Sequence, residues 1–284
     1  MVSALALFTG LLAQEAPPAR TDQSRLASVL KGGREYCRRL ETAALNFVCL
    51  EEASERIDLS RDGKAIVVNP SDIYSRASQL SRIPPAGLVK KNSYSYDYQF
   101  IRKAGQIKEK RVLLSINGKK AQEKDADSRT EAFRYADILL APIQLLDERF
   151  SDFYAYRLVR EDASNGEKAW VLEVSPRLSV VENYLGGTLW LRQSDYGILR
   201  IDWDPATFGR YESIRRRAKE QNVEPRVTSY SEFGFEKNGI RFPSLDFTEE
   251  GYLGKDGKRF VRAVTTVVYK NYRFFTVETE TAIK

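Results

Sequence analysis

The chain contains no histidine among its 284 residues. Histidine is the commonest general base and a frequent metal ligand, so Ser-His-Asp and Cys-His catalysis and most zinc sites are excluded. Carboxylate, tyrosine and lysine side chains remain available for acid–base chemistry. An enzyme built from this sequence would therefore have to rely on groups such as paired carboxylates.

Three groups of acidic residues could supply such a pair: Glu51-Glu52 with Glu55, Glu249-Glu250, and Glu278 with Glu280. Two carboxylates about 5 to 9 Å apart in a cleft carry out glycoside hydrolysis. On a β-strand Glu51 and Glu55 share a face, and Glu52 points to the opposite one. Glutamate is rarely buried without a partner, so all three groups are predicted to be solvated. A carboxylate-based hydrolase is kept as an alternative function.

Cys37 and Cys49 are the two cysteines of the chain. On one continuous helix they would lie about 18 Å apart and could not bond. If a helix ends near Thr42 and a strand beginning near Asn46 folds back, the two thiols can meet. In an oxidising compartment this predicts a disulfide, worth about 3 kcal/mol for so short a loop; the alternative is two unpaired buried thiols. Two cysteines without histidine do not predict a metal site.

Other short motifs do not indicate a cofactor. Residues 58–63 contain two aspartates and a glycine but lack the full calcium-loop pattern. Gly186-Gly187 does not open a helix after a strand, so a phosphate-binding loop is not predicted. The run Arg215-Arg216-Arg217 is interpreted as a solvated face, with a docking patch for anionic head groups as the alternative. No cofactor is expected.

The composition is that of a folded protein with a mixed surface. Apolar residues make up 42% of the chain and charged residues 30%, which allows a sizeable core. The net charge is +6, but Lys and Arg are interspersed with Asp and Glu along the chain. No basic helix or aromatic reading motif accompanies the charge, so nucleic acid is not an expected partner.

The N-terminal segment predicts export. Residues 4–13 (ALALFTGLLA) are too few to span a bilayer and have the length of a signal-peptide apolar region, although a basic segment does not precede them. The alternative is a stray apolar helix. Residues 1–16 are predicted as a signal peptide and residues 17–21 as a linker. No cysteine ends the apolar run, so the mature protein is expected to be soluble and periplasmic or otherwise exported.

Most of the chain shows the period-two alternation of β-strands. In residues 94–100 aromatic side chains alternate with polar ones, which predicts a strand with one buried face. Asn165-Gly166 and Asn238-Gly239 predict tight hairpin turns. The predicted strands occupy residues 46–59, 65–68, 94–100, 107–116, 152–160, 168–175, 187–191, 198–203, 226–235, 240–249, 258–269 and 273–283.

Helices are predicted in three places. Residues 22–42 have a helical apolar face, which Gly32-Gly33 divides into two pieces. Residues 130–150 form a helical insert that Pro142 breaks or kinks, placed to cover the sheet as a lid. A second insert at 204–225 contains one or two helical turns, and residues 69–85, with their prolines, are predicted as a loop.

These elements predict a mainly β (α+β) fold. About 10 to 12 antiparallel strands would form a single curled sheet, an incomplete barrel covered by helices, over residues 22–284. The alternation of apolar and polar residues predicts that fourteen side chains form a hydrophobic lining on the concave face of this sheet. They are Tyr96, Tyr98, Phe100, Val112, Leu114, Tyr156, Leu158, Trp170, Leu172, Leu189, Leu191, Leu199, Ile201 and Phe247. A filled core and an open cavity would both show this pattern.

Two stretches resemble a known family. Residues 187–202 (GTLWLRQSDYGILRID) pair a Gly-apolar-Trp strand with an apolar-Arg-apolar strand, and residues 230–247 (YSEFGFEKNGIRFPSLDF) contain an Asn-Gly turn with Pro243 three residues after Ile240. With residues 269–274, they resemble the LolA/LolB-like superfamily of outer-membrane lipoprotein-sorting carriers. The resemblance implies a half-barrel whose hydrophobic cavity, covered by helices, holds acyl chains.

Three functions are carried forward. The first is a non-enzymatic carrier or binding protein of the bacterial cell envelope, whose partners would be lipid or acyl chains, a lipidated protein, and peripherally the membrane. The second is an envelope structural or interaction module without a ligand cavity. The third is the carboxylate-based hydrolase. An internal void would favour the first, a filled interior with an exposed apolar patch the second, and converging carboxylates the third.

Overall fold

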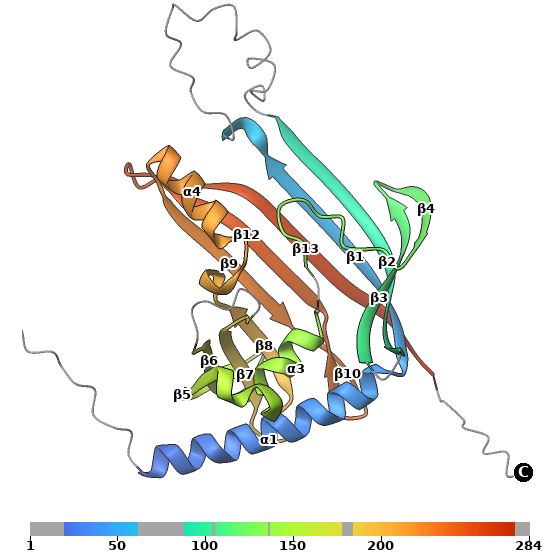
Figure 1. The fold of residues 1–284 in the computed structure, drawn as a ribbon, viewed down its shortest axis with the longest axis vertical. Coiled ribbons are helices and arrows are strands. Elements are labelled where there is room, and N and C mark those ends of the chain that lie inside the picture. The colour runs from blue at the N-terminus through green and yellow to red at the C-terminus, as the bar shows by residue number, and fades with distance from the viewer. Residues whose placement is uncertain (1–19, 62–87, 104–105, 136, 178–183, 276–284) are drawn as a thin grey trace, which may run out of the picture.

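The computed structural model of the chain describes residues 20–61, 88–103, 106–135, 137–177 and 184–275 (Figure 1). They form an antiparallel sheet of 11 strands and a separate two-stranded sheet. From one edge to the other, the large sheet consists of β4 (Lys119–Lys124), β3 (Gln106–Ile116), β2 (Val89–Lys103), β1 (Phe47–Asp58), β13 (Arg259–Phe274), β12 (Leu245–Leu253), β9 (Glu224–Glu232), β8 (Ile198–Trp203), β7 (Gly187–Arg192), β6 (Glu167–Pro176) and β5 (Tyr154–Ser164). The predicted single antiparallel sheet is confirmed. Its described strands leave β4 and β5 as edges, so the sheet is open.

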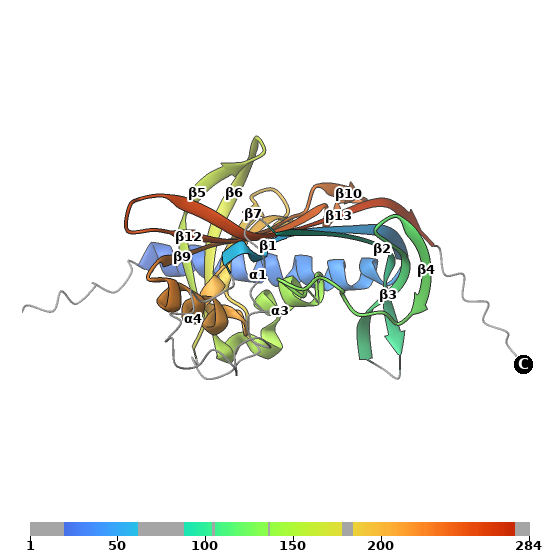
Figure 2. The same ribbon diagram turned by 90° about the horizontal axis from the view of Figure 1, so that it is seen from above.

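Within the described residues, three α-helices accompany the sheet: α1 (Arg20–Ala44), α3 (Leu140–Leu146) and α4 (Tyr211–Gln221). Figure 2 shows all three on the same side of the sheet, which is called the inner face below. The short 3₁₀ turns are η1 (Leu59–Arg61), η3 (Glu148–Phe153) and η4 (Pro205–Thr207), and the small sheet consists of β10 (Phe235–Lys237) and β11 (Ile240–Phe242). The main hydrophobic core lies between the inner face and these helices.

Helix α1 is one continuous helix of 25 residues, not the two pieces that were predicted. Its buried face carries Tyr36 and Leu40 at helical spacing. Gly32 does not break the helix, because its role is close packing: a Cβ there would lie 2.3 Å from the ring of Tyr196. Gly33 likewise faces Leu146 of α3. The absence of two side chains lets α1 lie directly on its neighbours.

The predicted turns occur where asparagine and glycine adopt left-handed conformations. Asn165 and Gly166 have φ of 52° and 82° and join β5 to β6, and Asn238 and Gly239 have φ of 53° and 72°. The second turn closes only the short β10–β11 hairpin. The longer strands on either side, β9 and β12, pair with each other in the large sheet.

The C-terminal strand differs from the prediction. Instead of two strands separated at 270–272, β13 runs for 16 residues and pairs with both β12 and β1. Asn271 has φ of 56°, and the β1–β13 register shifts between Val48 and Leu50. A left-handed residue therefore produces a bulge here and not a turn.

The two inserts have different outcomes. Residues 204–225 contain η4 and α4, as predicted. Residues 130–135 and 137–139 are not helical, and in the described part of the first insert the α-helix is limited to the seven residues of α3. Pro142 lies in the first turn of α3, where its missing N–H has no partner to lose. Pro142 is therefore accommodated in the first turn of a short helix and does not kink a long one.

Several predictions fall outside the described residues. These are the signal peptide at 1–16, residues 17–19 of the linker, the strand at 65–68 and the loop at 69–85. The last part of the linker differs, because α1 already begins at Arg20. No helix in the described ranges has the length and apolar character needed to cross a membrane.

Cys37 and Cys49 are free thiols in the structure, and both are buried in the main hydrophobic core. This arrangement corresponds to the unpaired alternative, and the predicted disulfide is not formed in it. Burial raises the pKa of both thiols well above its usual range. Both side chains therefore act as small apolar core residues.

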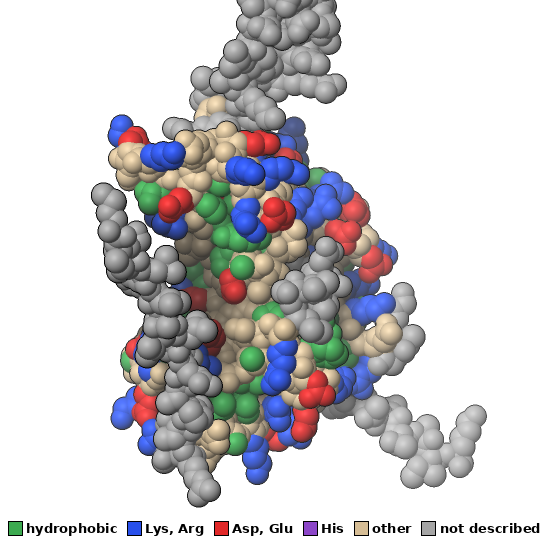
Figure 3. Space-filling view, turned by 60° about the vertical axis from the view of Figure 1, so that its left-hand side comes forward, with side chains coloured by type: hydrophobic (Ala, Val, Ile, Leu, Met, Phe, Trp, Pro, Cys, Tyr) green, Lys and Arg blue, Asp and Glu red, His purple; other side chains and the backbone are tan. Residues whose placement is uncertain are grey.

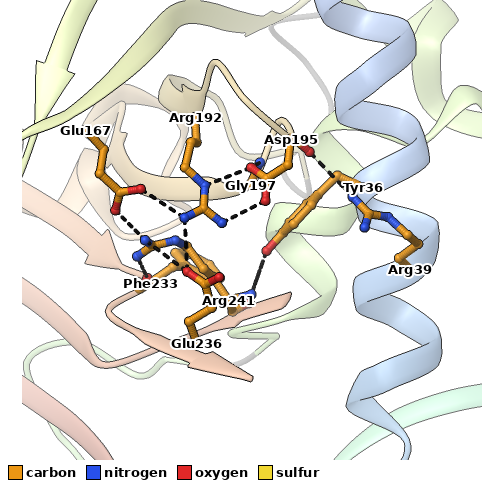
Figure 4. Close-up of polar contacts among 9 residues, drawn as sticks. All are labelled: Tyr36, Arg39, Glu167, Arg192, Asp195, Gly197, Phe233, Glu236 and Arg241. Carbon is orange, nitrogen blue, oxygen red and sulfur yellow. Dashed lines mark hydrogen bonds and ion pairs between the residues drawn. The ribbon is translucent and has the colours of Figure 1, made fainter. Parts of the chain in front are cut away.

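An ion-pair network joins the β7–β8 end of the sheet to the β10–β11 hairpin (Figure 4). The guanidinium of Arg192 donates to Asp195 at 2.7 and 2.8 Å, to Glu167 at 2.9 Å and to Glu236 at 3.0 Å. Arg241 pairs with the same two glutamates. Two arginines thus hold three carboxylates in one network, and the Arg192 side chain is only 15% exposed.

The same network anchors α1. The backbone N–H of Arg241 donates to the Tyr36 hydroxyl at 2.8 Å, and Arg39 donates to the carbonyl of Asp195 at 3.4 Å (Figure 4). Partial burial would raise the pKa of Asp195, but hydrogen bonds from Arg192 and from the Gly197 N–H hold it below its ordinary value. The charged form of Asp195 is therefore the one that the fold stabilises.

Replacing Arg192 by leucine should lower the free energy of unfolding by about 3 kcal/mol, because three partly buried carboxylates lose a shared counter-charge. Urea denaturation at neutral pH measures this change. Arg160→Leu is the matched control, since Arg160 is exposed and pairs only with Asp162; its change should stay within about 0.5 kcal/mol. Equal effects of the two substitutions would contradict the structural role of the network.

Candidate ligand-binding site

A cavity of about 630 Å³ lies against the inner face of the sheet, over β8, β9 and β12. Its floor consists of Ser229, Ser231, Asp246 and Thr248. The other lining residues are Phe133, Arg134, Tyr135, Asp137, Ile138, Ala141, Gln144, Tyr154, Leu185, Trp203, Thr207, Phe208, Gly209, Arg210 and Tyr230. Figure 3 shows a hollow in the molecular surface, with hydrophobic side chains and a carboxylate visible inside it. The volume falls within the range of small-molecule sites.

The floor of the cavity is polar and internally hydrogen-bonded. The Trp203 indole N–H donates to the Ser231 hydroxyl at 2.8 Å, and that hydroxyl in turn donates to the Asp246 carboxylate. Ser229 and Thr248 share a hydrogen bond of 2.9 Å. Burial raises the pKa of Asp246 to about 7, although the hydrogen bond from Ser231 acts to lower it. Near neutral pH the floor can thus be charged or neutral.

One side of the cavity is formed by a segment that crosses the inner face, residues 131–135 and 137–140, which is called the strap below. Three buried glutamates hold it. Glu55 accepts the backbone N–H groups of Glu131 and Ala132 at 2.8 and 2.7 Å. Glu51 accepts the hydroxyl of Tyr135 at 2.9 Å. The sheet therefore fixes the first half of the strap through carboxylates.

Glu109 of β3 holds the other half of the strap. It accepts the N–H groups of Ile138, Leu139 and Leu140 at 3.0, 2.7 and 3.1 Å, at the N-terminus of α3. Burial raises the pKa of Glu109, against the lowering effects of Arg111 and of the three N–H donors. One carboxylate thus provides acceptors for three amides at the start of a helix.

Arg111 compensates the buried charge beneath the strap. Its Nε donates to both carboxylate oxygens of Glu51 at 2.9 and 3.0 Å, and its Nη2 lies 3.6 Å from Glu109. The guanidinium lies 5.0 Å from the ring centroid of Tyr98 and 5.2 Å from that of Tyr135. This environment raises the pKa of Arg111 further, because the neighbouring carboxylates outweigh its desolvation.

The prediction that the acidic residues are solvated is wrong for three individual glutamates. Glu51, Glu55 and Glu250 are 0%, 3% and 1% exposed. Glu250 accepts hydrogen bonds from Arg217 and Arg262, so the run at 215–217 is not a wholly solvated face. These glutamates are buried because N–H and guanidinium donors surround them, the condition under which a charged group enters a protein interior. Residues 278–280 lie outside the described ranges.

None of the fourteen predicted lining residues lines this cavity. Seven of them, Tyr96, Tyr98, Phe100, Leu172, Leu189, Leu191 and Ile201, are buried in the main core, and Tyr156, Leu158 and Trp170 pack against it. Alternation thus located the inner face, but it selected the positions where large side chains fill the space. The residues that it missed are the small and polar ones of the floor.

The other four predicted lining residues are explained by β-bulges and by the face of the strand on which each side chain lies. The β2–β3 register shifts so that Tyr96 opposes Leu113, which places Leu113 and Arg111 inside and leaves Val112 and Leu114 only partly buried. A shift in β7–β8 brings Ile198 into the main core, whereas Leu199 is buried outside it. Phe247 lies on the face of β12 opposite to Asp246 and stacks on Tyr230 with ring centroids 5.2 Å apart.

Sequence comparison leaves the chain without a match: no family model and no curated protein is similar to it. Similar solved structures include a LolA superfamily protein from Nitrosomonas europaea, at 12% identity and TM-score 0.38 over 91% of this chain and 97% of that one. A DUF1329 family protein from Desulfovibrio piger aligns at 15% identity and TM-score 0.38, over 90% and 95%. A domain described as an outer-membrane lipoprotein-sorting protein, from Vibrio parahaemolyticus, aligns at 10% and 0.42, over 88% and 95%.

One of these structures, the protein from Nitrosomonas europaea, is described as a member of the LolA superfamily, which the sequence also resembles. The likeness is remote in both sequence and superposition, so the function is argued below from the cavity and the strap.

Replacing Glu109 by alanine should release the start of α3. Hydrogen exchange of the Leu139 and Leu140 amides should become faster, and the free energy of unfolding should fall by about 2 to 4 kcal/mol, because three partly buried donors lose their acceptor. Glu148→Ala is the control, since that side chain is 82% exposed. Unchanged exchange at both amides would contradict the role assigned to Glu109.

The raised pKa of Asp246 predicts a pH-dependent stability. An aspartate in the unfolded chain has a pKa of about 3.9, so between about pH 4 and pH 7 only the folded state binds this proton, and stability falls as the pH rises. Asp246→Asn should remove this loss. Its stability relative to the parent should rise from pH 5 to pH 8 by at least about 1 kcal/mol. Asp152→Asn, at an exposed position, should show a pH-independent difference.

Proposed function

We propose that this protein is an exported, non-enzymatic binding protein or carrier of the bacterial cell envelope. Its ligand would be a lipid, an acyl chain or the acyl group of a lipidated protein. The observation that carries the proposal is the cavity of about 630 Å³ between the strap and the inner face of the sheet. A hollow of this size favours a ligand-binding protein over an interaction module with a filled interior.

The walls of the cavity suit an amphipathic molecule. Apolar surface comes from the strap and α3 through Phe133, Ile138 and Ala141, and from the opposite side through Leu185 and Phe208. The floor supplies hydroxyl groups and Asp246. A mostly apolar pocket with a few convergent polar groups can bury an aliphatic chain and still orient one polar group.

The carboxylates beneath the strap support binding over hydrolysis. Glu51, Glu55 and Glu109 are already engaged by Arg111, by Tyr135 and by backbone N–H groups. None of the three lines the cavity. They therefore support the fold of the strap and are poorly placed to act on a bound ligand.

The strap would act as the cover of the site. It is attached by hydrogen bonds from its backbone to Glu55 and Glu109 and from the Tyr135 hydroxyl to Glu51, which can be broken and re-formed without unfolding the sheet itself. Opening of the strap would give a ligand access to the floor, and closing would remove the ligand from water. Loops that move in this way usually do so on the microsecond to millisecond timescale.

Replacing Ala141 by phenylalanine should fill part of the cavity and weaken uptake of the fluorescent fatty acid cis-parinaric acid by at least about tenfold, since a rigid ring would take the place of ligand volume. The measurement is a fluorescence titration of the full chain. Ala155→Phe is the matched control, because Ala155 is exposed on β5 and does not line the cavity; it should bind like the parent.

Native mass spectrometry with lipid extraction tests the same proposal independently. We expect lipid or fatty acid to accompany the purified protein. No recovered lipid, together with no uptake of cis-parinaric acid by the parent chain, would overturn the proposed function.

A further inference from the structure

A second pocket of about 450 Å³ adjoins the cavity, with Gly209 and Arg210 lining both. It lies between the inner side of α4, the end of β1 and the start of the strap. Three arginines line it, Arg210, Arg217 and Arg262. The only carboxylate among its described lining residues is that of Glu131. A mostly apolar compartment and a cationic one therefore lie on the two sides of a shared wall.

The negative charges nearest to the second pocket are already engaged. The carboxylate of Glu131 pairs with Lys90, which approaches from β2. Glu250 is buried beneath the pocket and is shared by two guanidinium groups, with Arg217 at 2.8 Å and Arg262 at 3.1 Å. Among the described residues, the wall of the pocket itself carries three guanidinium groups and one carboxylate, a balance that favours an anion.

Arg210 stands at the junction of the two pockets. Its Nη1 donates to the backbone carbonyls of Glu131 and Ala132 at 2.5 and 2.9 Å. In the described part of the chain no carboxylate lies within ion-pair distance of its guanidinium, and the residue is exposed. Its charge is therefore available to a bound group while its position is set by the strap.

The surroundings strengthen the attraction for an anion. Ile57, Leu59 and Ile214 form the apolar part of the pocket wall, and the side chains of Arg217 and Arg262 are only 27% and 12% exposed. Charges next to apolar walls interact more strongly than charges in water. Planar guanidinium groups match the oxygen atoms of carboxylates and phosphates, to which they donate pairs of hydrogen bonds.

We propose that the ligand is an anionic amphiphile, with its aliphatic chain in the cavity under the strap and its carboxylate or phosphate in the arginine-lined pocket beside α4. This inference rests on the proposed function and specifies the chemical class of its ligand. The head group would contact Arg210 first and Arg217 and Arg262 deeper in the pocket. The strap, bonded to Arg210 through two carbonyls, would lie against the ligand where the two pockets adjoin.

The test compares ligands that share one chain and differ in the head group. Dodecanoate and dodecyl phosphate are the anionic probes, monododecanoylglycerol is the neutral one, and dodecyltrimethylammonium is the cationic one. Each is titrated calorimetrically into the full chain below its critical micelle concentration. We expect both anionic probes to bind at least tenfold more tightly than the neutral one, the cation to bind most weakly, and the preference to shrink as salt is raised. The stronger of the two anions distinguishes a phosphate head group from a carboxylate.

Arg210→Gln should reduce the preference for anionic over neutral probes to threefold or less, because it should weaken the anionic probes more than monododecanoylglycerol. Arg215→Gln is the matched control on α4, the helix that begins directly after Arg210, since Arg215 is 63% exposed and lines neither pocket; it should keep the full preference. Arg210→Lys should retain part of the preference because the charge remains.

The possible failures are distinguishable. If the parent chain binds neutral and anionic probes equally, or if Arg210→Gln weakens all probes by the same factor, the assignment of an anionic head group is overturned and the cavity function stands. If no probe binds to the parent chain, the cavity function itself fails.

Discussion

The fold depends on how three glutamates can be buried on one face of a β-sheet. Glu51, Glu55 and Glu109 lie on the inner face of strands in the β1–β3 half of the sheet, where water is excluded. A buried carboxylate must be neutralised or surrounded by donors. Arg111 supplies the charge, and the backbone of the strap supplies the remaining N–H groups. The sheet therefore requires the strap for its own stability, and the strap takes its path from the positions of the carboxylates. This mutual dependence explains why a segment with so little secondary structure has a defined course.

The position of the cavity follows from side-chain size along the rows of the inner face. Directly opposed residues form a row in which Leu172, Leu189 and Ile201 lead to Ser231 and Asp246. The large side chains fill the space beneath α1 and α3, whereas the small ones at the centre of the sheet do not reach the strap. Space is left where small polar residues replace large apolar ones, and the floor hydrogen bonds make those residues tolerable there. Function on this face is thus located by the interruption of the hydrophobic pattern.

The sequence predicted what depends on local geometry. Period-two alternation located most strands, and Asn-Gly pairs located two turns, because both signals act over a few residues. The face of a side chain was less predictable: one extra residue in β3 reverses the phase at Val112 and Leu114, and no local feature of the sequence announces that bulge. Burial of Glu51 could not be predicted either, since its partners lie 60 and 84 residues away in Arg111 and Tyr135. For the floor, the alternation of Ser229 and Ser231 with Tyr230 was a readable signal, but it points to small residues and not to a lining of large ones.

The same carboxylates influence how the strap can open. If the strap lifts, its amides separate from Glu55 and Glu109, and the Tyr135 hydroxyl separates from Glu51. The separated groups then bond to water, so much of the hydrogen-bond energy is recovered and the net free energy of each bond is about 1 kcal/mol. The apolar contacts of Ile138 and Leu139 with the core have no such compensation and resist opening. A ligand chain under the strap would replace water at those side chains and at the cavity wall, and would favour the closed form by its differential affinity for it. Attachment by polar bonds to charged groups, combined with a small apolar anchor, therefore suits a cover that must close reversibly over a ligand.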